Sequence, residues 1–198
     1  RQLAANQLLQ RLLHAPIEAY TEDALIRNIA FVFQNVRLFH ISIYENVRLA
    51  NPDAQRAEVM EALHQAGCDS ILDKFKDREN TVIGSKGVYL SGGEKQRIAI
   101  ARAMLKNAKI VILDEASAAI DPENEHELQK AFAHLMKGKT VIMIAHRLSS
   151  IRNVDEILVL EDGKIVERGT DAALMATDTK YREYQTLYEQ ANEWRVVR

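Results

Sequence analysis

The sequence predicts an α/β fold in which a mostly parallel sheet is flanked by helices. Two short apolar runs, at 109–113 and 140–145, have the length and composition of buried strands. Between them, residues 122–137 carry apolar side chains at helical spacing, with Asp121 as N-cap and Pro122 at the first helical position. A strand, a helix and a strand joined by short links form a βαβ unit, so we expect parallel strands and a right-handed crossover.

The rest of the chain predicts further elements of both kinds. A helix over 54–66 is expected to begin with Asp53 as its N-cap and to end at Gly67. Other segments with helical spacing or capping signals are 3–13, 22–28, 69–76, 94–106, 147–152 and 177–192. Further strands are expected at 29–33, where the strand should be buried, and at 156–160 and 164–168, which the turn Glu161-Asp162-Gly163 joins as a hairpin.

The composition limits the classes of function. The chain has 198 residues, of which 47% are hydrophobic and 27% charged, a balance typical of a globular domain. The formal net charge of −2 and the lack of a long Lys/Arg run give no electrostatic basis for nucleic-acid binding. A single cysteine, Cys68, excludes a disulfide framework within the chain. No apolar run approaches the roughly 20 residues of a transmembrane helix, and no signal peptide is visible.

Two carboxylates, Asp114 and Glu115, directly follow the strand at 109–113. In open parallel sheets, ligands bind at the carboxyl ends of the strands. One carboxylate at such a place can hold Mg²⁺, and the other can orient or deprotonate an attacking water. On these residues alone, an ordinary helix N-cap explains the pair equally well.

His146 follows the strand at 140–145 at the same relative place. Neighbouring parallel strands end at one edge of a sheet, so His146 should face the same crevice as Asp114 and Glu115. A lone histidine is most often structural. Its placement on the edge where the carboxylates lie favours a functional role instead.

A serine and two glycines, Ser91-Gly92-Gly93, precede the helix predicted at 94–106. Paired glycines let backbone N–H groups approach a phosphate closely, Ser91 supplies a hydroxyl, and the helix N-terminus carries a partial positive charge. A phosphate site is therefore one interpretation of the motif. An ordinary helix start that contains glycine is the other, and the residues alone do not exclude it.

The order of the motifs resembles one family in particular. The chain resembles ABC transporter ATPase domains, whose motifs follow one another in the same order. The matching motifs lie at 91–97, 110–115, 117–121 and 145–147. Residues 33–39 resemble the glutamine loop of these domains. Residues 163–170 resemble the exporter-type subgroup in particular. The resemblance covers nearly the whole chain. It implies a P-loop NTPase-like, mostly parallel sheet with an inserted α-helical subdomain that carries the signature motif.

The resemblance implies catalytic and metal-binding roles. Glu115 would be the catalytic base, and His146 would contact the γ-phosphate of ATP. Gln34 would touch Mg²⁺ or the attacking water, and Asp114 would hold Mg²⁺. The implied chemistry is the in-line attack of water on the γ-phosphate, helped by positioning and charge stabilisation.

The resemblance also implies how the chain assembles. Ser91, Gly92, Gly93 and Glu94 would form the nucleotide-binding signature and clamp an ATP held mainly by the opposite subunit. Asp121 would lie at the interface of this head-to-tail dimer. The implied partners are a second ABC ATPase domain and a transmembrane domain, with no nucleic acid. The transmembrane domain would attach the chain to the cytoplasmic face of the cell (inner) membrane, where ATP hydrolysis would power transport of a substrate.

One family motif is missing from the sequence. No phosphate-binding G-x-x-x-x-G-K-[S/T] loop occurs. The helix at 3–13 resembles the one that follows that loop, so we expect the chain to begin just after it. Three accounts are open: a partial copy of an intact protein, a gene fragment, or a domain that lends only its signature face to a partner. We favour the first because Gln34, Glu115 and His146 are all present.

The resemblance predicts one ATPase domain over 1–198. Within it we expect a helical signature subdomain at 54–106, a catalytic α/β core at 107–170 and a C-terminal helical tail at 171–198. Two rival functions belong to other classes, namely a catalytically impaired regulatory half of a heterodimer and a soluble ABC ATPase of DNA repair or translation. The second rival usually carries coiled-coil insertions or tandem domains, and neither is visible here.

Overall fold

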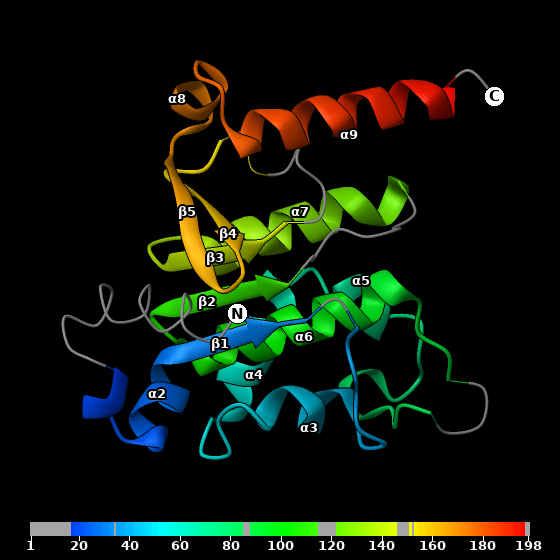
Figure 1. The fold of residues 1–198 in the computed structure, drawn as a ribbon. Helices are drawn as coiled ribbons and strands as arrows, with labels where there is room; N and C mark the ends of the chain where they lie inside the picture. The colour runs from blue at the N-terminus through cyan, green and yellow to red at the C-terminus, as the bar shows by residue number, and fades with distance from the viewer. Residues whose placement is uncertain are drawn as a thin grey trace. The chain divides into compact units, whose positions relative to one another are not determined.

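The computed structural model describes residues 17–33, 35–84, 88–114, 122–145, 151 and 153–196, in two compact units. Residues 17, 122–125 and 191–196 are described by their backbone alone. Glu22–Ile144 form the first unit, which we call the sheet unit. Arg1–Thr21 and Ala145–Arg198 form the second, which we call the hairpin unit. Figure 1 labels the α-helices and strands of both.

A three-stranded parallel sheet organises the sheet unit. Its strands are β1 (Ile29–Val32), β2 (Ile110–Asp114) and β3 (Thr140–Ile144), in the order β1-β2-β3. The helix between β2 and β3 is α7 (Pro122–Met136). The predicted βαβ unit and its parallel strands are therefore confirmed, as is the α/β fold class. The sequence did not predict that β1 pairs with β2.

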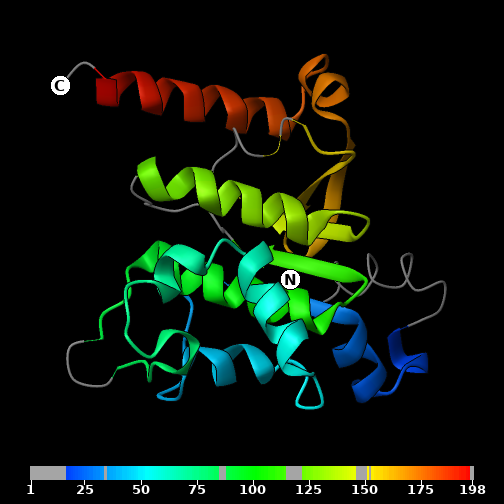
Figure 2. The same cartoon turned by 180° about the vertical axis from the view of Figure 1, so that it is seen from behind.

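The helical segments described in the sheet unit are α2 (Glu22–Asn28), α3 (Ile43–Arg48), α4 (Arg56–Gln65), α5 (Asp69–Leu72), the 3₁₀ turn η2 (Arg78–Asn80), α6 (Gly92–Lys106) and α7. Helix α6 contacts α3, α4, α7 and β1 (Figures 1 and 2). The core gathers fully buried side chains from most of these elements, namely Val32, Ile43, Leu63, Ile71, Ile98, Ile100, Leu113, Leu128 and Leu135.

The start of α4 differs from the prediction. Its N-cap is Gln55 and not Asp53, because the Glu58 carboxylate accepts a hydrogen bond from the Gln55 N–H at 2.7 Å. The predicted end is confirmed. Gly67 has a φ of +67°, and the Cys68 N–H donates back to the Leu63 carbonyl at 2.9 Å. This is the Schellman pattern, which requires a left-handed residue after the helix.

Two other predictions need correction. The helix expected over 69–76 ends at Leu72, where shorter bonds such as Phe75 N–H to the Leu72 carbonyl tighten the chain into turns. The strand at 29–33 is only partly buried. Phe31 of β1 and Phe33, which directly follows the strand, stack with their ring centroids 5.6 Å apart and are 50% and 57% exposed.

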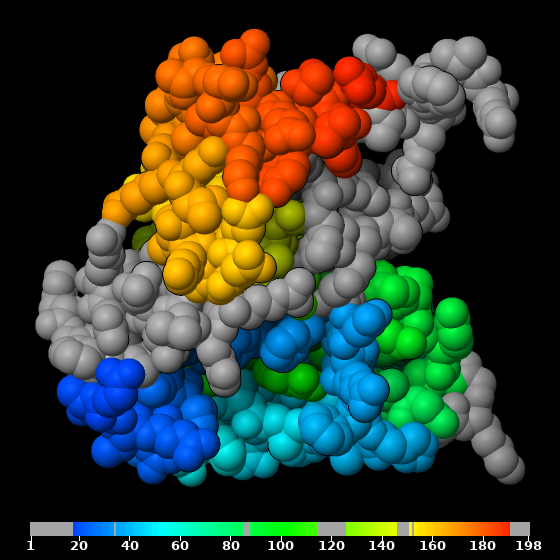
Figure 3. All heavy atoms as spheres, in the orientation of Figure 1, coloured from blue at the N-terminus to red at the C-terminus, as the bar shows by residue number. Residues whose placement is uncertain are grey.

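The hairpin unit consists of η1 (Ile17–Ala19), β4 (Ile157–Glu161), β5 (Lys164–Gly169), α8 (Asp171–Met175) and α9 (Lys180–Val196). The predicted antiparallel hairpin is confirmed, with Asp162 and Gly163 both at positive φ, as a type I′ turn requires. The hairpin, α8 and α9 pack through Ile157, Val159, Leu174 and Tyr181 and form one continuous surface in Figure 3. The helices predicted at 3–13 and, apart from residue 151, at 147–152 lie outside the described residues.

In the part of the chain that the structure describes, no helix combines the length and the apolar character that crossing a bilayer requires.

Candidate functional site

The signature segment forms the start of α6. Ser91 is the N-cap, in an extended conformation with φ −64° and ψ 166°. Its hydroxyl oxygen accepts a hydrogen bond from the Glu94 N–H at 3.3 Å, and the Glu94 carboxylate accepts one from the Ser91 N–H at 2.8 Å. This capping box fixes the serine relative to the helix. The helix therefore begins at Gly92, two residues before the predicted start.

Glu94 is held by a second partner as well. Lys74, in the turn after α5, donates a hydrogen bond from Nζ to Oε1 of Glu94. The Glu94 side chain is only 5% exposed, whereas that of Lys74 is 58% exposed. Burial alone would raise the pKa of Glu94, but the hydrogen bonds from Lys74 and from the Ser91 backbone outweigh it and hold the pKa below its usual value. The carboxylate is thus kept charged.

Gly92 lies at the exposed first position of α6, where its own fold does not require a glycine. Apart from its chain neighbours and the backbone of its own helix, a Cβ built at this position meets no atom of the described residues within 4 Å, and Gly92 is not among the glycines of positive φ. Backbone N–H groups in the first turn of a helix have no partner within the helix. Gly92 therefore leaves open space above a helix N-terminus, next to the Ser91 hydroxyl.

Asp114 lies at the carboxyl end of β2 and is half-buried. The register pairs Val32 of β1 with Leu113, and Asp114 itself with Ile144 of β3. All three strands thus end at one edge of the sheet. A carboxylate at such an edge offers the oxygen ligand that Mg²⁺ prefers, so Asp114 fits the predicted metal.

Four predicted site residues lie outside the part of the chain that the structure describes: Gln34, Glu115, Asp121 and His146. Gln34 comes two residues after the last residue of β1, Glu115 directly after β2, and His146 two residues after β3. Each therefore follows, in sequence, a strand that ends at the edge described above. Their roles stay predictions.

Sequence reasoning missed a buried polar network behind the signature helix. Asn46 of α3 is fully buried. Its side-chain oxygen accepts from the Phe39 N–H at 2.9 Å and from Arg102 Nη2 at 3.0 Å, while Arg102 Nε donates to the Asn46 carbonyl at 2.8 Å. The network ties the segment after Gln34 to α6. The signal was present, because Asn46 shares a helical face with the buried Ile43 and Val47.

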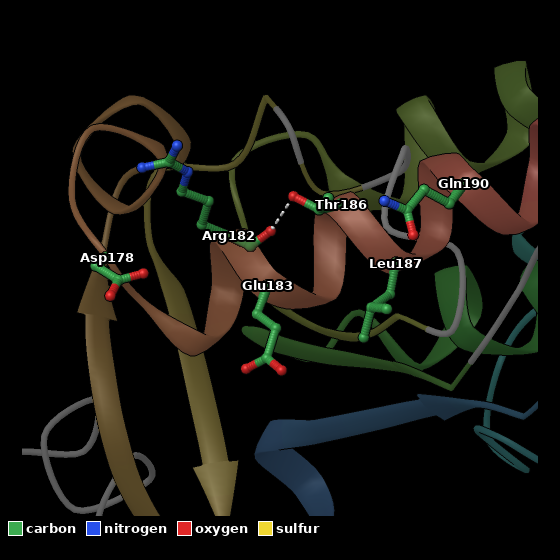
Figure 4. A pocket seen from close by; sticks show the side chains of 6 residues that line it. All are labelled: Asp178, Arg182, Glu183, Thr186, Leu187 and Gln190. Atoms are coloured by element: carbon green, nitrogen blue, oxygen red, sulfur yellow. Dashed lines mark hydrogen bonds between the residues drawn. The ribbon is translucent and has the colours of Figure 1, made fainter.

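The hairpin unit contains a hollow of about 350 Å³ along α9 (Figure 4). Thr186 on its wall donates a hydrogen bond to the Arg182 carbonyl at 2.9 Å. The hollow is lined by Asp178, Arg182, Glu183, Thr186, Leu187 and Gln190. One cation beside two carboxylates gives no excess positive charge, so this hollow does not suit a polyphosphate.

Comparison with known proteins identifies the family. The ABC transporter family model matches residues 6–118, more than half of the chain. The chain is 43% identical over 168 residues to the ATP-dependent lipid A-core flippase of Legionella pneumophila (strain Paris), covering 85% of this chain and 29% of the relative. The flippase of Pectobacterium atrosepticum is 45% identical over 172 residues, which cover 86% of this chain and 30% of that protein.

A plant relative shows the same similarity. ABC transporter B family member 14 of Arabidopsis thaliana is 43% identical over 174 residues, which make up 87% of this chain and 14% of the plant protein. The chain thus spans less than a third of the length of each of these relatives. A family match over more than half of the chain, together with the parallel sheet and the capped signature helix, shows that the chain belongs to the ABC transporter family, as part of its ATPase domain.

Proposed function

We propose that this chain binds and hydrolyses ATP to power transport through a membrane protein of the exporter type. The observation that carries the proposal is the start of α6. Gly92 is exposed, and a Cβ built on it meets no other part of the described chain within 4 Å, so nothing in the described residues accounts for a glycine there. A phosphate that approaches the helix N-terminus from outside the chain does account for it. Ser91, held by its capping box, would donate its hydroxyl hydrogen to the same phosphate.

The reaction would take place at the carboxyl edge of the parallel sheet. Glu115 would orient and deprotonate the attacking water, while Gln34 and His146 would contact the water and the γ-phosphate. Asp114 and Gln34 would hold Mg²⁺, which when bound supplies positive charge to the phosphate oxygens. In-line attack would then release phosphate, with positioning and charge stabilisation providing most of the rate enhancement.

The complete site would need two ATPase domains. Ser91, Gly92, Gly93 and Glu94 begin α6, whereas Asp114 ends β2, so the two parts of the site belong to different elements of the sheet unit. In the proposed head-to-tail dimer, the signature of one domain faces the ATP held by the other, with Asp121 at the interface. A helical subdomain at 54–106 would carry the signature, beside a catalytic core at 107–170 and a tail at 171–198.

The proposed location follows from the relatives, which are named as flippases and as a transporter. A transmembrane domain would hold the chain at the cytoplasmic face of the cell membrane. It would bind the transported substrate and change conformation when ATP drives the ATPase domains to dimerise.

A second candidate function differs from the first in one requirement. The 198 residues contain no G-x-x-x-x-G-K-[S/T] motif, whose backbone N–H groups and lysine would cradle the phosphates. A domain that contributes only its signature face to a partner's ATP would not need that motif.

The decisive experiment measures ATP hydrolysis by the protein expressed from its complete gene and purified in detergent. The proposal expects Mg²⁺-dependent turnover of at least about 1 s⁻¹, and a loss of about a hundredfold or more in Glu115→Gln. Retention of ATP-driven dimerisation in that variant would separate loss of chemistry from loss of binding. Equal ATP hydrolysis by the unmodified protein and by Glu115→Gln would refute the role of Glu115. Activity that appears only with a partner that carries the phosphate loop would favour the second function.

A further inference from the structure

The first turn of the signature helix contains a buried negative charge. Glu94 places a charged, 5% exposed carboxylate in the first turn of α6, close to Ser91 and Gly92. A carboxylate there is favourable for the helix, because it interacts with the positive end of the helix dipole. It is unfavourable for a second anion, because a phosphate at the same N-terminus would meet a like charge.

Lys74 is the cation placed against this charge. Its Nζ donates to Oε1 of Glu94, while Oε2 of the same carboxylate accepts from the Ser91 N–H. One carboxylate thus joins the lysine to the backbone of the signature serine. Lys74 lies on the turn that follows α5, 20 residues before Glu94, so the contact depends on the tertiary fold and not on helical spacing.

We propose that Lys74 is a positioning residue for the ATP site, and this inference rests on the proposed function. Lys74 offsets the charge of Glu94 and holds the carboxylate where it supports Ser91. The N-terminus of α6 then keeps both its capping box and its attraction for the γ-phosphate. Without the lysine, the buried carboxylate repels the phosphate and is free to leave the Ser91 N–H.

The test is a double-mutant cycle on the complete protein, with kcat and KM for MgATP and the melting temperature measured for each variant. Lys74→Met keeps the length of the side chain and removes its charge. We expect kcat/KM to fall on the order of tenfold, as one unit charge a few ångströms from a phosphate produces at a protein surface. The Lys74 side chain is 58% exposed, so the melting temperature should change by less than about 4 °C.

The second arm removes the charge that Lys74 offsets. The double variant Lys74→Met/Glu94→Gln should differ from Glu94→Gln alone by less than about twofold in kcat/KM. A tenfold loss in that background, or no loss in the original one, overturns the inference. Lys76→Met is the matched control, because Lys76 is an exposed lysine two residues further along. An equal loss in this control shows a general surface-charge effect and also overturns it. Failure of the proposed function is seen separately, as hydrolysis that Glu115→Gln does not reduce.

Discussion

Asn46 shows how much of the sheet unit depends on a single side chain. Beyond its bonds to Phe39 N–H and Arg102, its amide nitrogen donates to the carbonyls of Phe39 and Ser42, both at 3.0 Å. The neighbouring segment is held by the backbone as well, since Ile83 N–H donates to the Ile41 carbonyl at 3.0 Å. The chain after Gln34 and the chain before the signature are therefore joined, and Asn46 fixes this junction to α6.

We predict that Asn46→Ala lowers the free energy of unfolding by about 2–4 kcal/mol, because it leaves several buried polar groups without partners. Urea unfolding followed by circular dichroism would measure the loss. The exposed Asn80→Ala is a suitable control and should change stability by less than about 0.5 kcal/mol. A loss in Asn46→Ala no larger than that of the control would show that the network contributes little.

Cys68 provides a second residue-scale prediction. Its side chain is fully buried in the core of the sheet unit, and burial raises the pKa of the thiol to about 12. Only the thiolate reacts readily with thiol reagents. We therefore expect no labelling of the native protein at pH 8 over hours, and rapid labelling once urea unfolds the sheet unit. Fast labelling without denaturant would contradict the burial of Cys68.

At the scale of elements, the glycine that ends α4 and the glycine that begins α6 have different physical reasons. Gly67 ends α4 with a φ of +67°, and an added Cβ would lie 3.4 Å from Oε2 of Glu127. Gly92 begins α6 with no such demand from the backbone. The first glycine is thus required by the fold, and the second is available for a ligand.

This contrast predicts opposite effects of one substitution in a single unit. Gly67→Ala should lower the free energy of unfolding by about 1 kcal/mol or more, because alanine is strained at positive φ. Gly92→Ala should leave stability unchanged or raise it by up to about 1 kcal/mol, since alanine favours the helix. Chemical unfolding of both variants checks the pair. Equal effects of the two would mean that backbone conformation does not distinguish them.

At the scale of the whole molecule, buried carboxylates link stability to pH. The pKa of Glu94 lies below its ordinary value of 4.5 for the reasons given above. A hydrogen bond from its own backbone lowers the pKa of Glu79, burial opposes this, and Arg56 lowers the pKa further. Folded-state pKa values below the unfolded ones give stability that is complete above about pH 4.5. That stability is lost as the pH falls through the folded values.

We therefore predict that the contribution of Glu79 and Glu94 to the free energy of unfolding is steady from pH 7 to about pH 5 and is lost below about pH 4.5, so that the free energy of unfolding falls there. Urea titrations at half-unit steps of pH would follow it. The variant Glu94→Gln should show a shallower fall, because its side chain has no proton to gain. An identical slope in this variant would remove Glu94 from the explanation.

Some of the molecule could be predicted from the sequence, and some could not. Local rules found the turn at Asp162-Gly163 and the glycine that ends α4, because both depend on backbone conformation within a few residues. They did not find the Lys74–Glu94 contact, which tertiary folding alone creates. The periodicity of apolar residues also did not show which of them neighbouring elements would shield from solvent. Ile144 of β3 is apolar yet 49% exposed, because β2 is the one strand beside it in the described sheet.

The candidate site was predictable to a similar degree. Ser91 and Glu94 already match the S-x-x-E capping pattern, and Asp114 lies at the strand end where it was expected. The sequence of residues 29–32 does not specify which strand lies beside β1. Only the observed pairing of β1 with β2 shows that β1 ends at the same edge of the sheet. The family resemblance, and not local physics, supplied the roles of Gln34, Glu115, Asp121 and His146.

The central claim is that the N-terminus of α6 binds the phosphate of ATP, and the variant Gly92→Asp tests it most directly. Aspartate at the first position of a helix favours folding through the helix dipole, while its charge repels a phosphate. ATP hydrolysis and the melting temperature should be measured on the complete protein. The account predicts an unchanged or higher melting temperature together with a loss of activity of about a hundredfold. Full activity with the same stability would contradict it.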